Sequence, residues 1–412
     1  MLSFLSGCAT TVHVPQPAPQ LSSPPTPTTV IEHVSSVSTA ATPDNVISEP
    51  PPTVTPPVII SPPTVTEAPK RVDEGQAKTL LFQLLPSDIK DRQGWRDDIF
   101  TAFSHLKIPL EASYFCAAIA IIEQESSWQS DPIVPNLDNI VWKEIEKKAD
   151  NYHIPMLAIK TAFLKTSPNG KSYKYRIDHL RTEKQMNDLF EDMASEAKQL
   201  GLPLGIKNPI RTGGPMQVSI EFAEGHIRVW PYPYRYKGSI RSEVFSRRGG
   251  LYFGIANLLQ YRVNYPVMAY RFADFNAGRY SSRNAAFQAA LAKLSAEKIT
   301  LDGDLLMYKT DAMSETLQTL LALSKRLGLS RSQIERDLKL EKTEGFSQTM
   351  LYKRVFELAQ QQTGRVLAQQ VMPQIKLSSP KITRKLTTEW FANRVNGRFK
   401  QCMARAPDST PL

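Results

Sequence analysis

The spacing of hydrophobic and polar residues predicts a mainly helical protein from residue 72 onward. Apolar residues recur at intervals of three and four through the segments 74–87, 91–108, 182–201 and 346–371. This spacing places them on one face of an α-helix. Strand-like alternation is short and rare, so we expect the mainly α class.

One predicted helix, near residues 111–126, differs from the others. Every residue from Tyr114 to Ile122 is apolar, which is typical of a helix buried on all sides. Two acids, Glu123 and Glu125, follow at its end, about 200° apart around the helix axis, so they cannot both face one site. Burial and the negative end of the helix dipole would raise the pKa of a carboxyl there. The alternative is an ordinary solvated acid, and helix geometry alone does not choose between the two glutamates.

Residues 9–70 have a different composition and predict a disordered tether. Fifteen of the 31 prolines fall before residue 70, among Thr, Ser and Val. Such a segment has little to bury and is stiffened toward polyproline II. Extended at about 3 Å per residue, it could reach well over 100 Å.

The first eight residues, ending in Leu5-Ser6-Gly7-Cys8, resemble the lipobox of bacterial lipoproteins, in which the cysteine is acylated. The basic and apolar segments that usually precede a lipobox are missing, so we interpret residues 1–8 as the remnant of a signal peptide. Ala9, where some lipoproteins have Asp, favours the outer membrane. The resemblance implies a lipid anchor at Cys8 and a location in the bacterial envelope, facing the periplasm.

The remaining cysteines and the histidines suggest no metal or cofactor. Cys116 lies in the apolar helix, so a buried free thiol is the favoured state, and a disulfide with Cys402 is the alternative that an exported compartment permits. The six histidines show no metal-ligand spacing.

Three ordered segments resemble the lytic transglycosylases and goose-type lysozymes. "IIEQESSW" is similar to the family's Glu-Ser motif, "GGPMQVS" at 213–219 to its Gly-Leu-Met-Gln segment, and "DFNAGRY" at 274–280 to its Ala-Tyr-Asn-Ala-Gly segment. "GGLYFGIANLL" resembles the helix that leads to the last motif. The resemblance covers about residues 75–300 and implies a lysozyme-like helical domain.

The resemblance implies a role for each matching residue. Glu125 becomes the single catalytic acid and base, cleaving the bond between the sugars MurNAc and GlcNAc with no second carboxylate and no cofactor. The substrate-binding residues it implies are Ser126, Gly214, Met216, Gln217, Asp274, Phe275 and Asn276. Trp230, Tyr232, Tyr234 and Tyr236 offer flat surfaces for sugar rings, or else form a packed loop.

Three departures from the family pattern affect this interpretation. Glu125 and Gly214 are 89 positions apart (214 − 125), which requires an inserted helical subdomain at 132–210. Phe275 replaces the tyrosine of the third motif, so a hydroxyl is missing. Asp274 stands where the family has a small residue, and we hypothesise that its charge biases the pKa of Glu125.

The boundaries that follow are a domain at 72–300 and a helical C-terminal extension at 301–412. Residues 1–69 carry four acids and no Lys or Arg, so their charge is −4 and that of the remaining chain is about +14 (10 + 4). This excess suggests either an anionic partner or a solvated basic face. Peptidoglycan fits an exported protein and nucleic acid does not. Two other readings are a non-catalytic peptidoglycan-binding lipoprotein and a helical scaffold that binds protein partners through 301–412.

Overall fold

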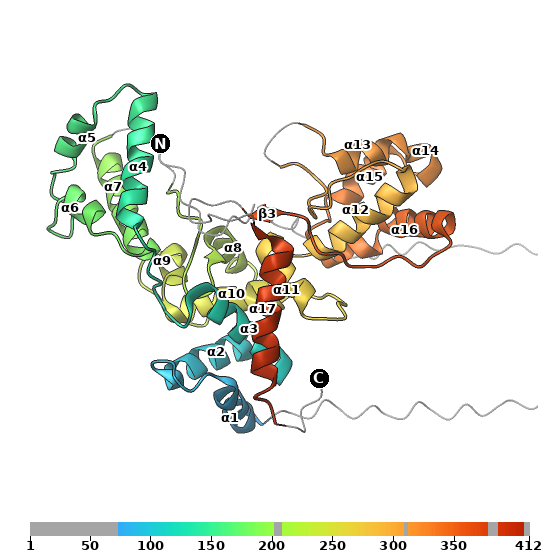
Figure 1. The fold of residues 1–412 in the computed structure, drawn as a ribbon, viewed down its shortest axis with the longest axis horizontal. Helices are drawn as coiled ribbons and strands as arrows, with labels where there is room; N and C mark the ends of the chain where they lie inside the picture. The colour runs from blue at the N-terminus through green and yellow to red at the C-terminus, as the bar shows by residue number, and fades with distance from the viewer. Residues whose placement is uncertain (1–72, 202–207, 309–311, 378–385, 408–412) are drawn as a thin grey trace, which may run out of the picture. The chain divides into compact units, whose positions relative to one another are not determined.

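The computed structural model describes residues 73–201, 208–308, 312–377 and 386–407. Within these ranges the protein is mainly helical, with four two-residue strands, which confirms the predicted class (Figure 1). No helix in this part of the chain is both long and apolar enough to cross a bilayer. The predicted lipidation site, Cys8, and the tether at 9–70 lie outside the described residues.

A first hydrophobic core is built by helices from both ends of the described chain. In it α17 packs on α3 and α11, α10 packs on α2, and α1 packs on α2 and α3. Figure 1 shows α17 beside α3, although 261 positions separate the end of one from the start of the other (388 − 126 − 1). The helices are α1 (Glu74–Leu84), α2 (Arg92–Leu106), α3 (Ala112–Ser126), α10 (Arg247–Leu259), α11 (Ala269–Ala277) and α17 (Thr388–Met403).

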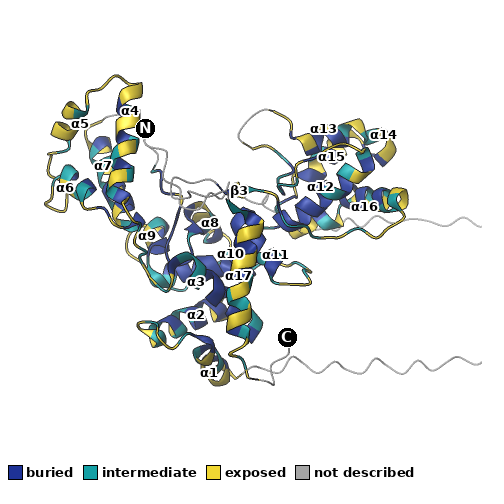
Figure 2. Cartoon of the chain, in the orientation of Figure 1, coloured by how far each residue is buried: buried dark blue, intermediate teal, exposed yellow. Residues whose placement is uncertain are grey.

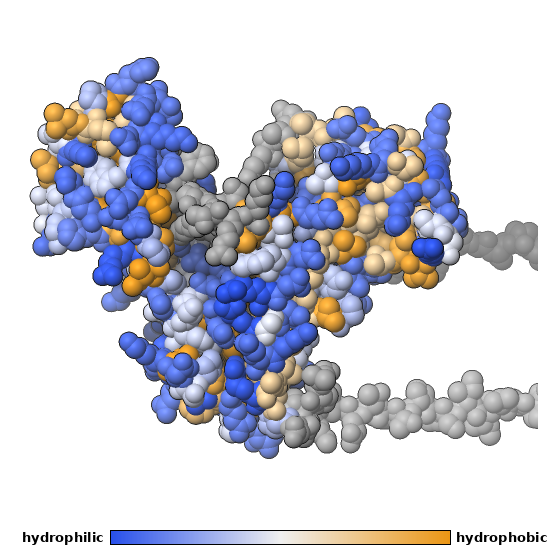
Figure 3. All heavy atoms as spheres, in the orientation of Figure 1, coloured by the Kyte–Doolittle hydropathy of each residue, from blue (hydrophilic) through white to orange (hydrophobic). Residues whose placement is uncertain are grey.

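The segment 132–210, predicted as a helical insertion, does contain four helices. They contact one another in the order α5, α4, α6, α7. Helix α5 has no buried residue, and Leu157 on it is 78% exposed; Figure 3 shows the hydrophobic colour over α5. The helices are α4 (Leu137–Asn151), α5 (Met156–Ala162), α6 (Tyr173–Asp178) and α7 (Glu183–Gln199).

A short hairpin and two small helices connect this segment to α10. Strand β1 (Thr212–Gly213) pairs antiparallel with β2 (Val218–Ser219), with Thr212 opposite Ser219. Helix α8 (Ile220–His226) begins directly after β2, capped by the Ser219 side chain, and α9 (Ile240–Val244) follows.

A second hydrophobic core lies in residues 281–359. It consists mainly of α12 (Ser281–Ser295), α13 (Glu315–Ala322), α14 (Ser324–Leu327), α15 (Arg331–Leu338), the 3₁₀ helix η1 (Glu344–Gln348) and α16 (Met350–Thr363). Strands β3 (Lys376–Leu377) and β4 (Leu386–Thr387) then pair, and the chain enters α17 of the first core. The cores thus divide the chain differently from the predicted boundary at 300, because α12 belongs with the C-terminal helices and α17 does not.

A disulfide joins Cys116 of α3 to Cys402 of α17, with Cα atoms 5.5 Å apart. The favoured prediction of a buried free thiol at Cys116 was therefore wrong, and the alternative is correct. Both residues are fully buried. The apolar surroundings that suggested a free thiol are the packed interface between the two helices.

Candidate functional site

Glu125 lies in the last turn of α3, where the helix leaves the core. Residues 115–122 before it are all buried (Figure 2), and Glu125 itself is half-buried. The helix ends because Ser127 and Trp128 both adopt left-handed backbone conformations, with φ of 47° and 64°. Such conformations cost about 1–3 kcal/mol each outside glycine and gather at functional sites.

Two buried polar atoms next to Glu125 have no hydrogen-bond partner within the described ranges. These are the indole nitrogen of Trp128 and the side-chain oxygen of Gln124. The Trp128 ring packs edge-on against Trp95, with centroids 5.2 Å apart. Unsatisfied buried groups are rare because each costs about 1–3 kcal/mol. Two such atoms beside a strained turn are consistent with a site in which a polar ligand supplies the missing hydrogen-bond partners.

Arg398 of α17 is a neighbour of Glu125 that the sequence reasoning missed. Its Nε lies 3.5 Å from Oε1 of Glu123, and its charge also interacts with Glu125. Burial lowers the pKa of Arg398, and the two carboxylates oppose that change. Glu123 is therefore held by an ion pair at the end of α3.

The hairpin at 212–219 presents the segment predicted to bind sugar. Gly214 has φ of 72°, and a Cβ there would lie 2.1 Å from the carbonyl oxygen of Val244, so this turn requires glycine. Met216 is fully buried and packs against Gly254 of α10. The side chain of Gln217 is half-buried, and its Oε1 accepts a hydrogen bond from the Thr212 hydroxyl at 3.2 Å. Gln217 is thus the polar group of this segment that remains partly accessible.

The third motif forms the C-terminal half of α11. Phe275 and Asn276 are buried, and the Asn276 Oδ1 accepts a hydrogen bond of 2.9 Å from the hydroxyl of Thr388, at the start of α17. Ser126, beside Glu125, is also buried, and its hydroxyl donates to the carbonyl oxygen of Ile122. The side chains of Asn276 and Ser126 are therefore used in hydrogen bonds within the fold, and they help to fix the positions of α17 and α3.

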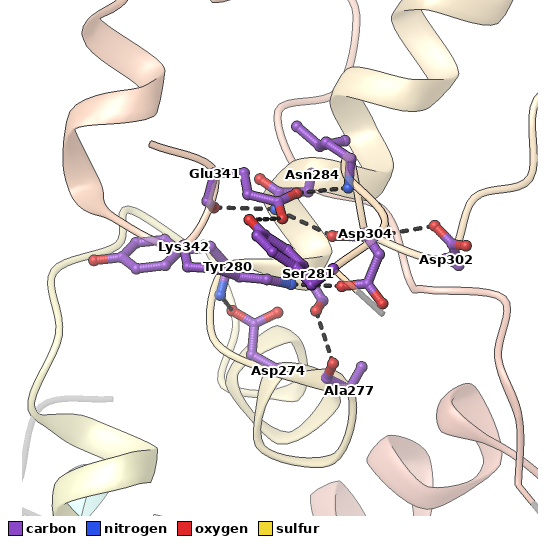
Figure 4. A network of polar contacts seen from close by, with 12 residues as sticks. Asp274, Ala277, Tyr280, Ser281, Asn284, Asp302, Asp304, Glu341 and Lys342 are labelled. Carbon is purple, nitrogen blue, oxygen red and sulfur yellow. Dashed lines mark hydrogen bonds and ion pairs between the residues drawn. The ribbon is translucent and has the colours of Figure 1, made fainter. Parts of the chain in front are cut away.

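Asp274 occupies a different environment from the one predicted for it. Its carboxylate is completely buried and accepts hydrogen bonds from the hydroxyls of Tyr261 and Tyr265 and from the backbone N–H groups of Tyr280 and Ser282. Figure 4 shows Asp274 beside Tyr280. Burial raises the pKa of Asp274, and these donors oppose the increase. The carboxylate caps the start of α12 and faces no open surface, which corrects the expectation that it contacts substrate.

Shared helices connect the matched segments to one another. The pairs Cys116–Cys402 and Glu123–Arg398 show that α3 and α17 run antiparallel. The end of α3, with Glu125, therefore lies near Arg398 in the middle of α17. Thr388, which bonds Asn276, is ten positions before Arg398 (398 − 388), or about 15 Å along the helix axis. On α10, the hairpin packs at residues 250–254, and Arg279 after α11 bonds the adjacent carbonyl groups of 256–257.

The aromatic loop at 230–236 is mostly packed, although Tyr236 is 41% exposed. Tyr232 stacks on Phe253 with centroids 5.0 Å apart, and its hydroxyl donates to Glu243 at 2.7 Å. The Trp230 indole donates to the carbonyl oxygen of His105. Among the described residues, no group of three His, Cys, Asp or Glu side chains could hold a metal ion.

Comparisons with known proteins give a family for this chain. It is 44% identical over 342 residues to the uncharacterized protein YaiW of Escherichia coli strain K12, covering 82% of this chain and 93% of the relative. No solved structure matches it significantly. A family described as "Protein of unknown function (DUF1615)" matches residues 88–405. The chain belongs to this family.

Proposed function

We propose that this protein is a lipid-anchored enzyme that cleaves peptidoglycan in the manner of a lytic transglycosylase. The observation that carries the proposal is the position of Glu125. It is a half-buried carboxyl at the end of a buried helix, beside a strained turn and two unsatisfied polar atoms. A carboxyl at the edge of an apolar core is the kind of group that can hold and release a proton.

In the proposed reaction, protonated Glu125 gives its proton to the glycosidic oxygen as the bond from that oxygen to C1 of MurNAc breaks. The resulting carboxylate then takes the proton of the MurNAc 6-hydroxyl, whose oxygen bonds to C1. The products are an anhydro-sugar end and a free hydroxyl on GlcNAc. Glu125 recovers its proton, so no second carboxylate or cofactor is needed.

The neighbours of Glu125 are given supporting roles. Gln217 is the accessible donor and acceptor for acetamido or hydroxyl groups of the glycan. Gly214 permits the hairpin to lie close to α10. Asn276 fixes the start of α17 and so the helix that carries Arg398.

One observation favours the alternative of a non-catalytic peptidoglycan-binding lipoprotein. The Arg398 guanidinium attracts Glu125, and a nearby cation favours the ionised form of a carboxyl, whereas the proposed first step needs the protonated form. Phe275 also lacks the hydroxyl that the resembled family has in its third motif.

The location is part of the proposal. Acylation at Cys8 would anchor the chain in the outer membrane, and the segment 9–70 would let the folded part reach the wall. The Cys116–Cys402 disulfide supports a compartment outside the reducing cytoplasm.

Incubation of the full chain with purified sacculi separates the candidate functions. Sedimentation measures binding, and chromatography of the supernatant measures released muropeptides. Binding with release supports the enzyme, and binding without release supports the binding protein. If the chain neither sediments with sacculi nor releases muropeptides, both proposals fail.

A further inference from the structure

A pocket of about 520 Å³ opens beside the second core, away from α3. Its lining comes from the loop 262–266, from the first turn of α12, and from residues 344–370. None of the residues that resemble the transglycosylase motifs, apart from Tyr280, belongs to this lining. The pocket is therefore a separate feature from the site around Glu125.

The pocket contains a buried arginine, Arg283, that forms no salt bridge with a described carboxylate, although the negative charge of the buried Asp274 acts on it. Arg283 is 6% exposed, and its guanidinium donates to the carbonyl oxygens of Thr343 and Glu341 and to Oδ1 of Asn284. All these acceptors are neutral, and within the described ranges no carboxylate forms an ion pair with Arg283. It lies over the ring of Tyr280, 4.3 Å from the centroid. A buried cation whose hydrogen-bond acceptors are all neutral is costly, so a negative group in the pocket would be stabilised.

The rest of the lining offers further groups that a ligand can use. The lining has two arginines, Arg262 and Arg283, and one acid, Glu344, for a net charge of +1 (2 − 1). Six polar side chains of the lining make no hydrogen bond or ion pair within the part of the chain that the structure describes: Arg262, Asn264, Tyr280, Glu344, Gln348 and Gln370. Arginine binds carboxylates in bidentate geometry, and carboxamides match the N–H and C=O groups of a peptide.

We propose that this pocket binds the carboxylate-bearing stem peptide of peptidoglycan. The carboxylates would lie against Arg262 and the exposed edge of Arg283, the carboxamides would pair with the peptide amides, and Tyr265 and Tyr352 would contact its methyl groups. The choice of a peptidoglycan peptide as the ligand rests on the proposed function. The expectation that the ligand carries carboxylates and amides rests on the residues that line the pocket.

The pocket is connected to the candidate site through the junction of α11 and α12. Tyr265 and Tyr280 form part of its wall, and both donate to Asp274, the hydroxyl of Tyr265 at 2.8 Å and the backbone N–H of Tyr280 at 3.0 Å. Asp274 directly precedes Phe275 and Asn276. One stretch of chain therefore contributes to both sites, as recognition of a glycan strand and its attached peptide requires.

Calorimetric titration of the full chain with a synthetic stem tetrapeptide tests the proposal. The matched variants are Arg262→Glu in the pocket and Arg365→Glu, an exposed arginine outside it. We expect Arg262→Glu to weaken binding about tenfold or more, because a charge-assisted contact becomes a repulsion. Arg365→Glu should bind as the wild type does, and a tetrapeptide with amidated carboxyls should bind poorly to all three proteins.

Three results would overturn the inference. The wild type could bind the amidated peptide as well as the charged one, both variants could lose peptide affinity equally, or the wild type could fail to bind the peptide at all. Thermal melts verify that each variant is folded. Glu125→Gln should bind the peptide as the wild type does, which separates the two proposals. If the peptide binds but sacculi are not cleaved, the pocket proposal stands and the enzyme proposal fails. If sacculi are cleaved but the peptide does not bind, the enzyme proposal stands and the pocket proposal fails.

Discussion

At the scale of single residues, the electrostatics of the candidate site depend on Arg398. It pairs with Glu123 and also attracts Glu125, from a helix that is far away in sequence. In the proposed reaction Glu125 must be protonated when the substrate is bound, whereas a nearby cation favours the ionised form of a carboxyl. Binding of a glycan that displaces Arg398 would remove this effect.

Replacing Arg398 by Gln should move the high-pH limb of sacculus cleavage to higher pH. Without the cation, nearby carboxyls hold a proton more readily, so the acid form of Glu125 persists further as pH rises. The measurement is the rate of muropeptide release against pH. Arg354→Gln, at an exposed position on α16, should leave the profile in place. An unchanged limb in Arg398→Gln would show that this charge does not control the acid.

Asp274 should make the stability of the protein depend on pH. Burial raises its pKa in the folded state above 3.8. As pH rises above that value, the unfolded chain releases the proton first, so folding stability declines through the window up to the folded pKa. Asp274→Asn should remove this decline, as measured by urea unfolding across a pH series that begins below 3.8 and rises to neutral.

The control for this experiment is Asp73→Asn, at an exposed N-cap of α1, which should retain the decline. If the slope of stability against pH is the same in Asp274→Asn as in the wild type, the carboxyl is not the group that titrates.

Residue-level predictability was uneven for physical reasons. The apolar run before Glu125 was enough to predict a buried helix with an acid at its end. The ion pair of Glu123 could not be predicted, because Arg398 reaches it only after the chain has folded. Asp274 was misjudged because local sequence does not reveal that four donors converge on its carboxylate.

At the scale of elements, α17 is held to α3 by the disulfide, and its start is bonded to α11. Its periodicity predicted a helix, and Figure 2 shows one buried and one exposed face. That pattern does not predict which helices the buried face contacts. The contact of Cys116 with Cys402, 286 positions apart, is the kind of long-range pairing that local patterns cannot supply.

Removing the disulfide should destabilise the protein. The double variant Cys116→Ala/Cys402→Ala should lose about 2–5 kcal/mol of unfolding free energy, because the unfolded chain is no longer cross-linked. Chemical denaturation with and without a reducing agent measures this. The reductant should lower the stability of the wild type toward that of the variant and leave the variant unchanged. A wild type insensitive to reductant after complete reduction would contradict the prediction.

The turn of the hairpin gives a prediction with an internal control. Gly214→Ala should destabilise the protein by about 2 kcal/mol or more, because it combines a positive φ with a close contact to Val244. Gly225→Ala, inside α8 with open space around it, should be neutral or stabilise by up to about 1 kcal/mol. Thermal melts of both variants give the comparison. Similar effects at the two glycines would contradict this account of the turn.

At the scale of the whole molecule, two hydrophobic cores meet at the junction of α11 and α12. The first takes its helices from the beginning and the end of the described chain, and the second takes the stretch between them. Sequence patterns predicted most of the helices, but they placed a domain boundary at 300. The two cores do not follow this boundary, because α12 packs with the helices after it and α17 packs with the first core, and sequence patterns alone do not give those partners.

The central claim is that Glu125 cleaves the glycan. The most direct measurement is mass spectrometry of the material released from purified sacculi by the wild type, Glu125→Gln and Glu123→Gln. The wild type should release muropeptides with anhydro ends. Glu125→Gln should release almost none while staying folded and bound to sacculi, and Glu123→Gln should retain most of the activity. Release by Glu125→Gln at the wild-type rate, or no release by a folded wild type, would contradict the claim.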